Sequence, residues 1–120
     1  MANGNLNELE AVVVRMETAG REWVKAKLLA DQLDDDTKSY LASIMNELDD
    51  GKTSEAKLDR LARGSKEFRE FVRSAAIARA DMLKKKVRYD GEQSLFEAKR
   101  SEYAMERSKI EKGIFHTGGK

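Results

Sequence analysis

The chain lacks cysteine and proline altogether and holds a single histidine among its 120 residues. Without cysteine it can form neither disulfides nor thiolate metal sites, a composition that suits a reducing compartment such as the cytoplasm. Average usage would place about six prolines in a chain of this length, and their absence removes the residue that most strongly interrupts helices. We therefore expect a cytoplasmic protein built from long helices.

Long apolar runs are missing as well. No stretch approaches the ~20 apolar residues that cross a bilayer, and Met1 to Gly4 lack the basic and apolar segments of a signal peptide. We therefore expect neither secretion nor a membrane partner. Charged residues make up 38% of the chain and hydrophobic ones 40%, which favours a narrow seam between helices over a wide globular core.

A repeat of seven runs through residues 65–112. Every seventh position is apolar or aromatic: Phe68, Ala75, Met82, Tyr89, Phe96, Tyr103 and Ile110. Such a repeat keeps one side of a slightly under-wound helix against a partner helix, so it predicts one very long C-terminal helix. Polar residues four positions further on are expected to interleave with this seam: Arg79, Lys86, Gln93, Arg100 and Arg107.

The first half of the chain shows related spacing. Apolar residues alternate by three and four and predict a helix over 6–33: Leu9, Val12, Met16, Ala19, Trp23, Ala26, Ala30 and Leu33. Gly20, within this helix, is interpreted as a site of close packing. Asp34 to Asp36 are expected to end the helix and cap a second one at 37–50, which Gly51 closes. A third helix is expected at 54–63, capped by Thr53 or Ser54 and closed by Gly64, and Ser65 is expected to cap the long helix that follows.

The predicted fold is thus all-α. It is an elongated helical hairpin or coiled-coil bundle, a single domain over 1–112 with two short connecting helices and a flexible tail at 113–120. Short connections make neighbouring helices antiparallel, which places Leu33 near Phe68 and Leu9 near position 92. The first helix would then be too short to cover the last part of the seam, so we predict a homo-oligomer interface at Phe96, Tyr103 and Ile110.

Charge is distributed unevenly although the net charge is only +1. Residues 1–50 hold 5 Lys/Arg and 11 Asp/Glu, while residues 51–120 hold 18 and 11. This asymmetry favours an anionic partner, or equally an acidic helix lying against a basic one. The candidate contacts to single-stranded nucleic acid are Lys66, Arg69, Arg73, Lys84, Lys85, Lys86, Arg88 and, for stacking, Tyr89. The alternative for these residues is a solvated outer face.

Residues suited to catalysis or metal binding are scarce. His116, the only histidine, lies among glycines, where nothing would hold it in a catalytic geometry. Residues 113–120 resemble a phosphate-binding loop superficially, but a glycine stands where the lysine should be and no strand precedes them. The two acidic groups, at 34–36 and 47–50, are assigned to capping and solubility rather than to a bound cation. We predict no enzymatic activity, no cofactor and no metal.

Three segments carry a resemblance to a known group of proteins. KVRYD at 86–90, SLFEAKRSE at 94–102 and GIFHT at 113–117 resemble small uncharacterised helical proteins of tailed bacteriophages, some of which accompany DNA recombination and replication genes. The resemblance covers mainly the last third of the chain. It implies a role in phage DNA metabolism, or interference with the host, in the cytoplasm of the host cell.

These observations predict two leading functions as alternatives. In the first, a non-enzymatic accessory protein of DNA metabolism binds single-stranded nucleic acid, or a protein on it, through the basic helix face. In the second, a phage-encoded inhibitor or adaptor presents its helix surface to a host protein. A structural spacer in a virion is a third possibility. Steep salt dependence would mark the first function, whereas a complex that survives high salt and needs no nucleic acid would mark protein binding.

Overall fold

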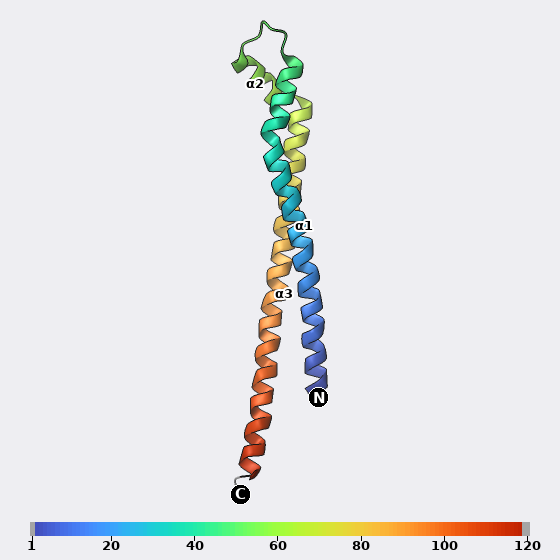
Figure 1. Cartoon of the computed structure of the whole chain (residues 1–120), viewed down its shortest axis with the longest axis vertical. Helices are drawn as coiled ribbons and strands as arrows, with labels where there is room; N and C mark the ends of the chain where they lie inside the picture. The colour runs from blue at the N-terminus through green and yellow to red at the C-terminus, as the bar shows by residue number, and fades with distance from the viewer. Residues whose placement is uncertain (1, 119–120) are drawn as a thin grey trace. The chain divides into compact units, whose positions relative to one another are not determined.

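A computed structural model describes the backbone of residues 2–118 and the side chains of residues 7–112. Over these described residues the chain forms three helices and no strand: α1 (Ala2–Leu48), α2 (Glu55–Arg63) and α3 (Lys66–Gly118) (Figure 1). The predicted all-α fold with a very long C-terminal helix is confirmed. The chain divides into two compact units: unit 1 holds Met1–Glu22 and Lys85–Lys120, and unit 2 holds Trp23–Lys84.

The break expected at Asp34 to Asp36 is wrong, because α1 continues through these residues to Leu48. The three-and-four alternation does not stop at Leu33 but goes on through Thr37, Tyr40 and Ile44, which are buried or partly buried. Asp34 forms an ion pair with Arg79 of α3, which offsets the low helix propensity of aspartate. The helix expected at 37–50 is therefore the last part of α1, and only α2 connects the two long helices.

Unit 2 encloses the main apolar core between α1 and α3. One cluster joins Ala26 and Ala30 to Ala78 and Met82, with Trp23 and Leu33 packed against it. A second cluster, nearer the connection, consists of Leu41, Ile44, Ala62 and Phe68. Tyr40 stacks on Phe71 beside this cluster, with ring centroids 4.6 Å apart. The small residues of the first cluster let the two backbones approach closely, and the larger side chains of the second fill the space beside α2.

The connection between the helices follows the expected capping pattern. Gly51 adopts φ of 78°, a left-handed conformation that favours glycine, just after the end of α1. The Ser54 hydroxyl accepts from the backbone N–H of Lys57 at 3.3 Å and caps α2. The Ser65 hydroxyl accepts from the N–H of Phe68 at 3.2 Å and caps α3. The predicted caps Ser54 and Ser65 are therefore confirmed.

The register between α1 and α3 differs from the prediction. Phe68 packs with Leu41 and Ile44 rather than with Leu33, because α1 extends fifteen residues beyond position 33. In unit 1 the Nζ of Lys99 lies 3.3 Å from Oε2 of Glu8, so α1 accompanies α3 past Phe96. The expectation that α1 leaves Phe96 uncovered is therefore wrong. α3 also continues to Gly118 rather than ending at Lys112. The backbone of residues 119–120 and the side chains of the whole expected tail, 113–120, lie outside the described residues.

The heptad residues of α3 that begin with Phe68 are joined in the contact with α1 by the residues three positions further on, and not by those four positions further on as predicted. Phe71, Ala78, Lys85, Glu92 and Lys99 are buried or partly buried, whereas the residues expected there are exposed: Arg79, Lys86, Gln93, Arg100 and Arg107. The seam is consequently apolar on both sides in unit 2. In unit 1 aromatic residues alternate with Lys85, Glu92 and Lys99, so charged side chains enter the contact between the helices.

Candidate functional site

Part of the unevenly distributed charge is paired in ion pairs between α1 and α3. The Nη1 of Arg88 lies 3.1 Å from Oε2 of Glu22, and Lys99 and Arg79 pair with Glu8 and Asp34. In each of these pairs α1 supplies the acid and α3 the base, whereas the Arg15–Glu92 pair, at 3.2 Å, reverses the order. Hydrogen bonding and attraction from Glu8 raise the pKa of Lys99 above its usual value. An acidic helix lying against a basic one therefore accounts for part of the asymmetry.

The predicted nucleic-acid contacts of unit 2 lie on the exposed side of α3. Lys66 is exposed and pairs loosely with Glu70, its Nζ 3.9 Å from the carboxylate oxygen. Arg69, Arg73 and Lys84 are also exposed, and among the described residues they make no side-chain hydrogen bond or ion pair. These three side chains are available to a partner.

The remaining candidates belong to unit 1 and are less available. Lys85 is partly buried and already in contact with other groups. Arg88 is held by Glu22, which leaves Lys86 as the exposed cation of this group that has no ion pair within the described part of the chain. Tyr89 is partly buried, and its ring lies over Gly20. A Cβ atom added at Gly20 would lie 3.0 Å from Cε2 of the tyrosine ring. The tyrosine ring therefore serves helix packing, and the predicted role of Gly20 in close packing is confirmed.

The residues predicted for an oligomer interface differ in exposure. Phe96 and Tyr103 are partly buried, and the guanidinium of Arg100 lies 5.9 Å from the centroid of the Phe96 ring. Ile110 is 56% exposed and shares a small depression of about 60 Å³ with Tyr103. The structural reason for placing Phe96 in an oligomer interface disappears with the corrected register, and the homo-oligomer itself stays a prediction.

A feature missed in the sequence is an apolar row on the exposed side of α3. We call Ala76, Ala80 and Leu83 the outer row; all three are exposed, and Leu83 is 52% exposed. Their spacing of four and three residues places them within about 60° of arc on a helix, on the side opposite the buried Ala75, Ala78 and Met82. The same three-and-four alternation that revealed the seam could have found this row.

The outer row interrupts the basic series of α3. Arg73 and Lys84 stand at its two ends, eleven residues or about 16 Å apart along the helix, and no basic residue occupies the exposed face between them except Arg79, which pairs with Asp34. A continuous track of cations for a phosphate backbone is therefore not formed in unit 2. The exposed face between these two cations is instead mainly apolar, and the exposed Val72 and Val87 continue the same spacing beyond them.

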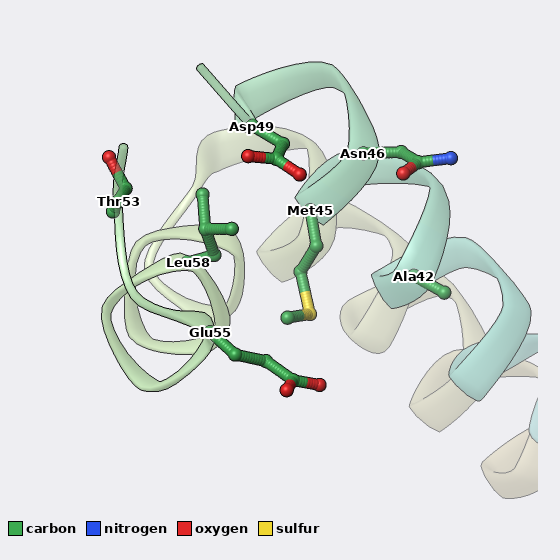
Figure 2. A pocket seen from close by; sticks show the side chains of 7 residues that line it. All are labelled: Ala42, Met45, Asn46, Asp49, Thr53, Glu55 and Leu58. Carbon is green, nitrogen blue, oxygen red and sulfur yellow. The ribbon is translucent and has the colours of Figure 1, made fainter. Parts of the chain in front are cut away.

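A cleft of about 410 Å³ lies beside the connection in unit 2 (Figure 2). It is lined by Ala42, Met45 and Asn46 of α1, by Asp49 and Thr53 of the connection, and by Glu55 and Leu58 of α2. Figure 2 shows Met45 extending from α1 toward α2, while the amide of Asn46 points to the other side. The cleft exists because α2 turns back beside the last turns of α1, a relationship that no single stretch of sequence reveals.

The turn next to this cleft is fixed by two aspartates. Oδ1 of Asp49 accepts from the N–H of Gly51 at 2.9 Å. Oδ1 of Asp50 accepts from the N–H of Lys52 and from the N–H and hydroxyl of Thr53, each at 2.9 Å. The bond from Lys52, followed by those from Thr53, lowers the pKa of Asp50. These bonds hold the carboxylate of Asp49 at the rim of the cleft.

Within the described residues no three His, Asp or Glu side chains gather closely enough to hold a metal ion. No helix in the same part of the chain has the length and apolarity needed to cross a membrane. Comparisons of the chain with protein-family models, curated proteins and solved structures find no match. The resemblance to phage proteins therefore stays an expectation, and the function has to be argued from the surfaces themselves.

Proposed function

We propose that the chain is a non-enzymatic binding module that packs a helix of another protein against the outer row of α3. The observation that carries this proposal is the exposed apolar row at three-and-four spacing between Arg73 and Lys84. This spacing is the one by which helices pack side by side. It repeats, on the exposed side of α3, the arrangement by which the buried side contacts α1.

The residue types of the outer row fit a closely packed helix. Ala76 and Ala80 are small, so the backbone of a partner helix can approach, and Leu83 supplies a side chain for its groove. The cations at the two ends favour a partner helix that carries acidic residues there, because opposite charges at the rim steer and orient a complex. We therefore expect an amphipathic, acidic helix as the ligand.

The test is capture of a partner from lysate of the source cells, with nuclease present and at about 0.5 M salt. Leu83→Glu places a carboxylate in the apolar contact, where it loses hydration, and should abolish capture. Leu29→Glu is the matched control, because Leu29 is a leucine of similar exposure, 55%, on α1. Equal capture by both variants would show that the outer row is not the surface that binds the partner.

Single-stranded nucleic acid is the second candidate ligand. It is favoured by the exposed Arg69, Arg73, Lys84 and Lys86, which make no ion pair with other described residues. A fluorescence titration with labelled oligonucleotides at about 50 mM salt tests it, and each phosphate contact should contribute about 0.7 to the salt slope. An unchanged salt slope in the Arg69→Gln/Arg73→Gln variant would show that these arginines do not contact phosphates. No binding at high micromolar protein would refute the nucleic-acid hypothesis.

A further inference from the structure

The cleft of unit 2 combines an apolar floor with an acidic rim (Figure 2). Leu58 is 7% exposed, and Met45 packs against the cluster formed by Leu41, Ile44 and Phe68. The charged residues among those that line the cleft are Asp49 and Glu55, both acidic. A ligand that fits both features must carry an aliphatic portion and a cation.

The surroundings of the cleft strengthen its preference for a cation. α1 ends at Leu48, next to Asp49, and its last turn contains no basic residue. The carbonyl groups at the end of a helix carry negative partial charge, so this end adds to the field of the Asp49 carboxylate. Among the described residues Glu55 makes no side-chain hydrogen bond or ion pair, so its carboxylate is available to a ligand.

We propose that this cleft binds an arginine of a partner polypeptide together with an apolar residue beside it. The stem of arginine would lie on Met45 and Leu58 while its head remains among polar groups. The planar guanidinium would donate to the carboxylate of Asp49 or to that of Glu55, which Figure 2 shows on opposite sides of Met45. Two parallel bonds to one carboxylate suit arginine better than lysine. The volume of about 410 Å³ is at the lower end of the range for ligand pockets, roughly 300–1,000 Å³, and accommodates a short segment rather than a folded domain.

This inference does not depend on the proposed function, because none of the residues that line the cleft belongs to the outer row. The probe is the peptide acetyl-Ala-Leu-Arg-Ala-amide, titrated into the ¹⁵N-labelled full chain and followed by NMR. The amide signals of Gly51, Thr53 and Glu55 should shift with one common dissociation constant. A matched peptide with citrulline in place of arginine, which keeps the shape and loses the charge, should bind at least fivefold more weakly.

Two variants locate the binding. Asp49→Asn/Glu55→Gln removes both charges but keeps an acceptor for the N–H of Gly51, and it should weaken peptide binding at least fivefold. Glu47→Gln removes one charge from the same turn outside the cleft and should change binding less than twofold. Equal affinity for the citrulline peptide, unchanged affinity in the double variant, or no shifts at 5 mM peptide would overturn the proposal. Equal affinity for N-acetylarginine amide alone would overturn the part assigned to the apolar floor.

Discussion

Gly20 and Gly91 provide a matched pair of substitutions that tests the packing of unit 1. Both glycines lie inside long helices, so alanine removes a propensity cost of about 1 kcal/mol at each site. A Cβ atom at Gly91 would meet nothing within 4 Å. Gly91→Ala should therefore raise the free energy of unfolding by about 1 kcal/mol, because it contributes the propensity gain and no new contact.

Gly20→Ala should behave in the opposite way. Its Cβ atom would lie 3.0 Å from Cε2 and 3.3 Å from Cδ2 of Tyr89, so the ring must move. Overpacking of this kind costs roughly 1–3 kcal/mol, which cancels or exceeds the propensity gain. We expect a change between about zero and a loss of 2 kcal/mol, measured by urea unfolding followed through circular dichroism at 222 nm.

The contact with Tyr89 can be isolated by a double substitution. In a Tyr89→Ala background the ring is gone, so Gly20→Ala should become stabilising by about 1 kcal/mol, as Gly91→Ala is in the wild-type chain. Equal stabilisation by Gly20→Ala and Gly91→Ala in the wild-type chain would show that the Tyr89 ring does not lie over Gly20. The antiparallel register assigned to unit 1 would then be refuted as well.

Three further expectations concern the core, the turn and association. Trp23→Ala should lower the free energy of unfolding by about 3 kcal/mol, because Trp23 packs on the first cluster of unit 2; an unchanged Tm would contradict this. The pKa of Asp50 is lower when folded, so its stabilisation is complete above its ordinary pKa of 3.8 and disappears as pH falls through the lowered value. Asp50→Asn should remove that pH dependence of the urea midpoint, whereas the exposed Asp35→Asn should preserve it. Sedimentation at tens of micromolar should show an oligomer that Ile110→Glu dissociates, and a wild-type monomer would end that prediction.

The sequence predicted the parts of the fold that depend on local spacing. The residues from Leu9 to Leu33 assigned to the α1 seam are buried or partly buried, and Ser54 and Ser65 cap the helices expected to follow them. The helix break expected at Asp34 to Asp36 does not form, because the alternation that packs α1 on α3 continues through Thr37 and Ile44 and outweighs the preference of aspartate for caps. The ion pair between Asp34 and Arg79, which helps α1 to continue, joins residues 45 positions apart and could not be read locally.

The candidate surfaces were less predictable for a related reason. The basic residues were found from composition, but the ion pair that holds Arg88 and the packing of Tyr89 over Gly20 depend on the register between two helices. The cleft depends on how α2 turns back beside α1. The outer row, by contrast, is visible in the spacing of Ala76, Ala80 and Leu83, although alanines on an exposed helix face are common and do not by themselves mark a contact surface.

The most direct test of the central claim is site-specific photocrosslinking from the outer row. A benzophenone amino acid at Ala80, incorporated in the source cells, reports what lies against the exposed side of α3. We predict one dominant protein crosslink at Ala80 that resists nuclease, with the attachment point in an acidic amphipathic helix of the partner. The same amino acid at Leu29 on α1 should give no such product. Crosslinks to nucleic acid at Ala80, or equal protein crosslinking from both positions, would contradict the account.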